Sequence, residues 1–389
     1  MGMRLERTVW PVGHGAFYTE QFKDENNHVL FTAVYDCGSE QEDALKKCIK
    51  ELLPEKRQLV IDALFISHFH SDHVNGLEYL LGKNVLVKKL FIPQLTDNYV
   101  INVLAEEFGD GGNRLHIDTL NFLRRLYNGE TIANVEEILE VPVIEGENIP
   151  GEEYRPDETI INRKHAVSPV VVEKKINDVP FWVYIPYNHY KNNNLDQVFI
   201  KYGYGNNNVV DVNHIFEDLI NGNWKYIQEV FSEIYDDKHN EYSMTVYSGA
   251  DVNASFDTIV ADLLFNFSYI WYHPHGGIMI DEQQLGCLYT GDFEAKKYTN
   301  MLIGFYSKMH DAWDRTYLLQ VPHHGSYKNY EEHLYNNHRK LTFISSAIND
   351  SYGHPHVQTL VDVSNKDCPI VIVQDNKATV LRIDYNIEY

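Results

Sequence analysis

The chain has 389 residues, of which 44% are hydrophobic and 13% aromatic, a composition that is typical of globular proteins and excludes extended disorder. Its 56 acidic side chains outnumber its 33 basic ones, so the formal charge is −23. This charge disfavours a broad nucleic-acid-binding surface, because binding to a phosphate backbone depends on Lys and Arg. A local basic groove, or one neutralised by bound metal, stays compatible with it.

Nothing in the sequence indicates export or a membrane. No stretch reaches transmembrane length, and charged and polar residues stand where a signal peptide would have its apolar core. Four scattered cysteines without C-x-x-C spacing do not suggest a disulfide framework: Cys37, Cys48, Cys287 and Cys368. We therefore expect a cytoplasmic protein without membrane insertion.

The first ninety or so residues alternate strand and helix signals. Residues 7–13 and 29–35 are apolar and rich in β-branched residues, and they predict strands. Residues 41–53 predict a helix, because Ser39 and Glu42 fit a capping box and the apolar residues that follow share one face.

A run of metal-ligand residues follows at once. Residues 59–66 predict a buried strand and residues 74–81 a short helix, and between them stand three imidazoles and a carboxylate: His68, His70, Asp72 and His73. Imidazole and carboxylate bind divalent transition metals near neutral pH. Four such side chains within six residues favour a metal site over a polar loop that happens to be rich in histidine.

The middle of the chain, about residues 95–240, is less regular. It has helix signals at 117–127 and 224–235, and Gly-, Pro- and Asn-rich passages lie between them. The aromatic residues of 212–235 have the spacing of a packed core. With no clean linker in sight, we expect one domain over 1–389 that carries this middle as an insertion, which could bind a partner protein.

Strand and helix signals return after residue 287, and further metal-ligand residues follow the strands. The predicted strands are 288–290, 317–321, 341–345 and 370–373. Asp292 follows the first of them and could bridge two cations, while His323 and His324 follow the second. Asp36, at the end of the early strand, either orients a ligand from behind or only begins a turn.

These runs, in this order, resemble the metallo-β-lactamase superfamily, and within it the hydrolase domain of the competence protein ComEC. The matching runs are Val12-Gly13-His14-Gly15, Tyr35-Asp36-Cys37-Gly38, His68 to His73, Thr290 to Glu294, Val321 to Ser326 and Asn349 to Pro355. The resemblance implies a four-layer αββα sandwich with a dinuclear centre at its edge. It covers both ends of the chain but not the middle, and it includes no part of ComEC's membrane channel.

Carried over by position, the resemblance implies two divalent ions, Zn²⁺ or Mn²⁺. His68 and His70 would hold the first ion, Asp72 and His73 the second, and Asp292 would bridge them. His323 would complete the second site, with His324 as the second choice because it lies one residue farther from the strand. The substrate pocket would be lined by Ser326, Asn349, Tyr352 and His354, although Asn349 and Tyr352 could instead only shape a turn and His354 only introduce a helix.

Two positions depart from the family pattern. Ile185 stands in the predicted strand 181–186 where the family often has a further ligand of the first site, and His189, His273 or His275 are the alternatives. Ala16 stands where the subgroup usually has an acid.

The resemblance favours phosphodiester hydrolysis of a small nucleotide or a short single strand. Two cations roughly 3.5–4 Å apart lower the pKa of a shared water and so supply hydroxide at neutral pH. Asp72 could also orient the nucleophile, and His354 or a metal-bound water could assist the leaving oxygen. The alternatives are lactone or thioester hydrolysis, and a partner-binding subunit that keeps the metal but turns over little, which Ile185 motivates.

Overall fold

The computed structural model describes the greater part of the chain. The described residues are 2–109, 117–144, 164–165, 172–176, 179–189, 196–206, 209–223, 227, 229–230, 243–251, 254, 258–264, 270–272, 285–336, 340–349 and 351–388. Among them, no helix is long and apolar enough to cross a membrane.

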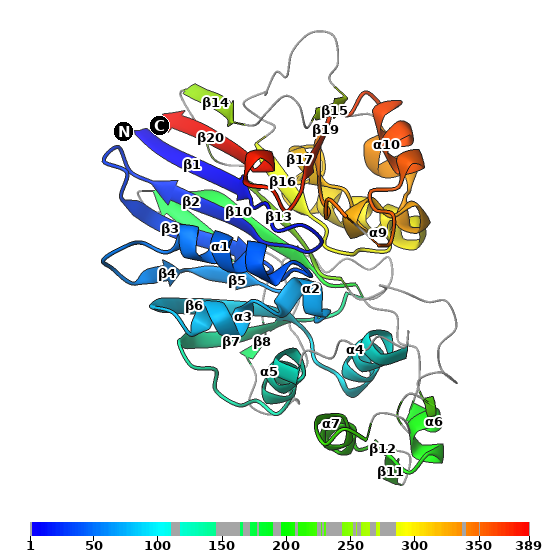
Figure 1. Cartoon of the computed structure of the whole chain (residues 1–389). Coiled ribbons are helices and arrows are strands. Elements are labelled where there is room, and N and C mark those ends of the chain that lie inside the picture. Colours follow the sequence, from blue (N-terminus) through cyan, green and yellow to red (C-terminus); the bar gives the residue numbers. More distant parts are fainter. Residues whose placement is uncertain are drawn as a thin grey trace.

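The first of two large mixed sheets begins and ends with the chain. Its strands run in the order β14 (Thr258–Leu264), β20 (Leu381–Glu388), β1 (Gly2–Val9), β2 (Tyr18–Lys23), β3 (Val29–Tyr35), β5 (Ala63–Phe65), β6 (Val85–Pro93), β7 (Val135–Val141) and β8 (Lys164–His165), and β4 (Leu59–Ile61) also pairs with β6. The strands from β14 to β3 are antiparallel and those from β3 to β8 are parallel. Because β1 pairs with β20, the two ends of the chain lie side by side (Figure 1).

The second sheet holds most of the later strands. Its order is β15 (Ile270–Tyr272), β19 (Ile370–Val373), β18 (Leu341–Ser345), β17 (Thr316–Gln320), β16 (Gly286–Tyr289), β13 (Thr245–Ala250), β10 (Val179–Tyr187) and β9 (Val172–Ile176). β16 to β19 run parallel, so their carboxyl ends meet at one edge. A separate pair is formed by β11 (Gly205–Asn206) and β12 (Val209–Val210).

Helices pack against each of the two sheets. Beside the first sheet lie α1 (Glu42–Leu52), α2 (Ser71–Val74), α3 (Leu77–Leu81), α4 (Asp97–Gly109) and α5 (Ile117–Tyr127), and α7 (Val212–Ile220) packs against α4 and α5 (Figure 1). On the second sheet pack α9 (Ala295–Lys308) and α10 (Val357–Ser364), while α6 (Asp196–Lys201) contacts β11 and β12. Short 3₁₀ turns are η2 (His323–Gly325), η3 (Tyr327–Asn329), η4 (Glu332–Tyr335) and η5 (Lys377–Thr379). A third apolar core, with residues such as Phe22 and Trp182, lies between the sheets.

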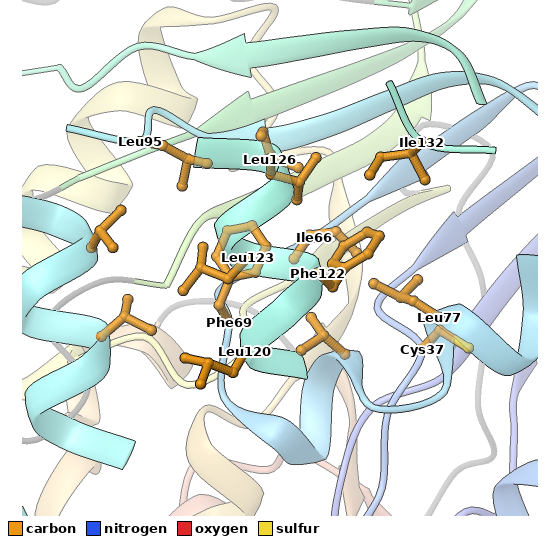
Figure 2. Close-up of a cluster of buried hydrophobic side chains, with 14 of the residues drawn as sticks. Cys37, Ile66, Phe69, Leu77, Leu95, Leu120, Phe122, Leu123, Leu126 and Ile132 are labelled. Carbon is orange, nitrogen blue, oxygen red and sulfur yellow. The ribbon is translucent and has the colours of Figure 1, made fainter. Parts of the chain in front are cut away.

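One apolar core positions the metal-ligand loop. Leu120 and Leu123 of α5 point toward Ile66 and Phe69, as Figure 2 shows. Phe69 is fully buried although it stands between His68 and His70. Its burial turns the loop's apolar residue toward the helices and leaves the neighbouring imidazoles on the other side.

Several predicted elements have the bounds seen in the structure, namely β3, β18, β19 and α5. Others differ. The predicted strand 7–13 is β1, which ends at Val9, and the predicted helix 224–235 lies mostly outside the described residues. The predicted capping box is wrong: Gln41 is the N-cap of α1, and the Ser39 hydroxyl instead donates to the carbonyl of Val12 (2.6 Å).

The predicted strand 59–66 and helix 74–81 are each divided. Asp62 separates β4 from β5 because its carboxylate accepts from the Thr32 amide (2.9 Å) and its own amide donates to the Thr32 carbonyl (2.8 Å). The helix begins earlier, as α2, and resumes as α3. The segment of about 95–240, predicted as an insertion, contributes β7 to β10 to the two sheets, so only part of it lies outside them.

Candidate metal centre

Two groups of ligand-type side chains meet at the carboxyl ends of the central strands. One group is His68, His73 and Asp292, and the other is His14, Asp72 and His324. Within each group the potential ligand atoms lie within 4.8 Å of one another. Three of these residues come from the predicted loop, while Asp292 follows β16 and His324 follows β17.

The two groups are adjacent. The Nε2 atom of His73 lies 3.2 Å from Asp292 Oδ1 and 3.6 Å from Asp72 Oδ2. The Nε2 atom of His324 lies 3.3 Å from Asp72 Oδ2 and 3.6 Å from Asp292 Oδ1. The two carboxylates therefore stand between the imidazoles of both groups.

Hydrogen bonds hold the ligand imidazoles in place from behind. The Nδ1 atom of His73 contacts a carboxylate oxygen of Asp36 (2.8 Å), and Nδ1 of His324 contacts the Ser345 carbonyl (2.9 Å). Since these oxygens only accept, each Nδ1 carries the proton and each Nε2 keeps its lone pair. Asp36 also accepts from the Ser67 amide (2.7 Å) and hydroxyl (2.6 Å), which is the orienting position that the sequence suggested for it.

These residues fit a bound metal. Among the described residues, no hydrogen-bond partner is found for the buried Nε2 atoms of His68, His73 and His324 or for the buried Oδ1 atom of Asp292. Buried polar atoms are normally satisfied, so a cluster of such atoms that face one another needs a further group between them. A divalent cation accepts all four as ligands.

The pKa shifts of the histidines in the centre also fit a bound cation. Burial lowers the pKa of His68 well below its usual range, and the neighbouring His73 lowers it further, so His68 is neutral and can bind metal. Burial also acts to lower the pKa of His73, but Asp72 and Asp292 raise it well above the usual range. The two buried carboxylates thus make a position that favours positive charge.

His323 differs from the prediction, which made it the ligand and placed His324 behind it. Its Nδ1 contacts the side-chain nitrogen of Asn329 (2.9 Å), which can only donate, so its Nε2 carries the proton. That Nε2 lies 3.9 Å from Asp292 Oδ2. Burial lowers the pKa of His323 to about 3, so the ring is a neutral hydrogen-bond donor at the site. His324 belongs to one of the two compact groups, whereas His323 belongs to neither.

His70 is the remaining predicted metal ligand, and three further histidines were the alternatives for the ligand position that Ile185 occupies. The ring of His70 is 4.5 Å from that of His68, although His70 is in neither compact group. Ile185 is fully buried in the core beside α9, and His189 packs against Tyr298 (ring centroids 4.3 Å apart) and is in neither group. His273 and His275 lie outside the described residues.

Two of the four predicted pocket residues border the centre. The rings of Tyr352 and His354 lie 5.3 and 5.8 Å from that of His14, and the ring of His354 lies 5.5 Å from that of His323. Tyr352 is 61% exposed and His354 is half-buried. Ser326 is buried, and its amide donates to the His323 carbonyl (2.8 Å), whereas Asn349 is exposed.

The sequence reasoning gave no role to His14. The signal was present, because His14 stands in one of the runs that carry the family resemblance. Its loop lies more than fifty residues before the metal-ligand loop, and only the folded chain brings the two together.

The comparisons with known proteins agree in part with the motifs. Residues 9–139, about a third of the chain, match the model of a family described as Anti-Pycsar protein Apyc1. This stretch includes His14 and the run from His68 to His73. The relation to the ComEC subgroup stays a prediction. No curated protein matches the chain.

Solved structures give only distant similarities. A long-form RNase Z from yeast has 10% sequence identity and a TM-score of 0.30, and the alignment covers 96% of this chain but 37% of that one. Unliganded yeast PDE1 has 9% identity and a TM-score of 0.30, with both chains covered in full. At these TM-scores neither similarity carries weight for fold or activity.

Proposed function

We propose that this protein is a metal-dependent phosphodiesterase that acts on small nucleotides, built as a metallo-β-lactamase-type sandwich. The observation that carries the proposal is the pair of adjacent ligand groups joined through Asp72 and Asp292. Paired divalent ions are a recurrent device for displacement at phosphorus. The match of residues 9–139 to an Anti-Pycsar family model supports it and makes a cyclic nucleotide the first substrate to test.

Two divalent ions, Zn²⁺ or Mn²⁺, would be held by six side chains: His68, His70, Asp72, His73, Asp292 and His324. When bound, such ions lower the pKa of water and neutralise charge on a phosphoryl group. In this proposal His68 and His70 would hold the first ion, Asp72, His73 and His324 would hold the second, and Asp292 would be a ligand of both. The ligand set of nitrogen and oxygen atoms suits both metals.

The surrounding residues bind and orient the substrate in this proposal. The Nε2–H of His323 points toward Asp292 and would donate to a phosphoryl oxygen held there. A water that has lost one proton to solvent would attack phosphorus as hydroxide, oriented by Asp72, and the P–O ester bond would break as His354 gives a proton to the leaving oxygen. The exposed ring of Tyr352 offers a face on which a nucleobase can stack.

The reaction class is tested by a substrate screen with defined metal content. The protein is stripped with a chelator, reloaded with Zn²⁺ or Mn²⁺, and given a 3′,5′-cyclic nucleotide, a dinucleotide, a short single strand, RNA and a lactone. We expect hydrolysis of phosphodiesters that returns with the metal and that Asp292→Asn abolishes. Faster turnover of the lactone, or no phosphodiester hydrolysis by protein loaded with two ions, would overturn the proposal.

A further inference from the structure

His14 belongs to a ligand group although nothing in the proposed mechanism uses it. Its Nε2 atom lies 3.9 Å from Asp72 Oδ2, the same oxygen that lies 3.3 Å from Nε2 of His324. The centroids of the two imidazole rings are 3.9 Å apart. His14 is 5% exposed, so its ring meets this carboxylate inside the protein.

Hydrogen bonds fix the backbone of His14 on both sides. Its amide donates to the side-chain oxygen of Gln41 (2.7 Å). Its carbonyl accepts from the amide of Glu40 (2.9 Å) and the hydroxyl of Ser39 (3.2 Å). The imidazole therefore projects from an anchored backbone, which is what a metal site requires of its ligands.

The next two residues attach this loop to the metal-ligand loop. The Ala16 amide donates to the carbonyls of both Gly38 (3.2 Å) and Asp72 (3.3 Å). Gly15 has a φ of +145°, and a Cβ there would lie 2.6 Å from the carbonyl oxygens of Asp72 and Gly38. Only glycine permits this approach, so the backbone of Gly15, next to His14, lies against that of Asp72.

We propose that His14 is a protein ligand of the second metal ion, together with Asp72 and His324. The inference rests on the proposed metal centre but does not depend on its substrate. Nε2 of His324 has its lone pair available, as shown by the bond from its Nδ1 to Ser345, and Nε2 of His14 lies near the same oxygen of Asp72. The free-energy cost of burying an imidazole beside a carboxylate and a second imidazole is offset best when one cation binds all three.

The proposal implies that the two sites bind their ions with different affinities. The strand end that often supplies a ligand to the first site carries Ile185 here, which is buried in the core and has no ligand atom. His14 instead adds an imidazole to the second site. We therefore infer that the second ion is held more tightly than the first.

The test measures metal binding directly. Apo-protein is titrated with Co²⁺, and the number of bound ions is determined by native mass spectrometry, for the wild type, His14→Gln and His14→Cys. We expect two ions on the wild type and a loss of affinity for one ion in His14→Gln of at least about 10–100-fold, the effect of removing an outer-shell partner. His14→Cys restores the ion and gives a thiolate-to-Co²⁺ charge-transfer band, which requires direct coordination.

Tyr352→Ala is the matched control, since it removes a neighbouring ring that offers no strong metal ligand and should keep both ions. The proposal is overturned if folded His14→Gln binds both ions as tightly as the wild type, or if His14→Cys binds Co²⁺ without the charge-transfer band. Should His14→Gln not fold, the His14→Cys spectrum decides alone. A wild type that binds two ions but hydrolyses no phosphodiester would overturn the proposed function and leave this inference standing.

Discussion

His323 and His324 are neighbours in the chain but differ in their hydrogen bonds. We expect His324→Ala to weaken binding of one ion by more than about 100-fold, because it removes a ligand and not an outer-shell partner. We expect His323→Ala to keep both ions and lose turnover, because its Nε2–H faces the reacting centre. Metal content after dialysis against a chelator and kcat on one phosphodiester check both. Loss of an ion from His323→Ala alone would reverse the assignment.

The sequence could not separate these two histidines. Counting from the strand end made His323 the ligand, which assumes that the backbone continues regularly. In the structure both residues have a left-handed backbone, with φ of +49° and +50°. Non-glycine residues rarely adopt this conformation, and it redirects their side chains in a way that residue spacing does not reveal. His68, Asp72 and His73 could be grouped from the sequence because they are close together in it.

At the scale of secondary structure, a buried lysine joins the starts of two neighbouring strands. Lys340 precedes β18 and is 1% exposed, and its Nζ donates to the carbonyl of Trp313 (3.3 Å), near the start of β17. The same Nζ lies 3.7 Å from the centroid of the Trp313 ring. Burial lowers the pKa of Lys340 to about 7, although Cys368 and Asp314 act to raise it.

This pKa predicts a pH dependence of stability. Between pH 7 and the pKa of an unfolded lysine, about 10.4, the unfolded chain binds more protons at Lys340 than the native chain does. The free energy of unfolding contributed by this residue therefore rises with pH in that window. We expect the wild type to gain stability relative to Lys340→Met between pH 7 and pH 9.5, as measured by urea unfolding. A stability difference that stays constant over this range would contradict the shifted pKa.

Helices and strands were predictable where the pattern of their own residues determines their bounds. β3 and α5 carry continuous apolar patterns, and their bounds were read correctly. The break between β4 and β5 was not, because it depends on Asp62 bonding to Thr32, thirty residues away. Ser39 was misread for the same reason, since its hydroxyl bonds to the Val12 carbonyl in place of a helix amide. Long-range bonds of this kind have no signature in a single sequence.

At the scale of the whole molecule, one buried ion pair joins the two sheets. Arg7 of β1 donates to Glu20 of β2 (2.7 Å), and Glu20 also accepts from the hydroxyls of Tyr184, Ser248 and Tyr289 of the second sheet. Arg7 and Glu20 are each 2% exposed. The network satisfies both charges inside the core.

We expect Arg7→Met to lower the free energy of unfolding by about 3–5 kcal/mol, because it leaves the carboxylate of Glu20 buried without its cation. Adding Glu20→Gln to that variant should recover part of the loss, since the unpaired charge is then gone. Chemical denaturation of the single and double variants measures this. An Arg7→Met protein as stable as the wild type would show that this ion pair contributes nothing to the free energy of unfolding.

The charge of the whole molecule limits the size of the substrate. With 56 acidic and 33 basic side chains, the mean field of the protein repels a polyanion, and the repulsion grows with the number of phosphates near the surface. A cyclic nucleotide or dinucleotide brings few phosphates and meets the ions in the centre, so it escapes most of this penalty. A long duplex brings many phosphates near the surface and does not escape this penalty. We therefore expect kcat/KM for a small nucleotide to exceed that for long duplex DNA.

Salt separates this explanation from a hidden basic groove. Added salt screens repulsion, so duplex cleavage, if any, should improve or stay flat as salt rises, and hydrolysis of a small nucleotide should change little. A basic groove predicts the opposite, because binding that displaces counterions from phosphates weakens steeply as salt rises. Comparing kcat/KM for a dinucleotide, a short single strand and long duplex DNA across a salt series decides between them. Tight processing of the duplex that collapses with salt would show that local positive charge overrides the net charge of −23.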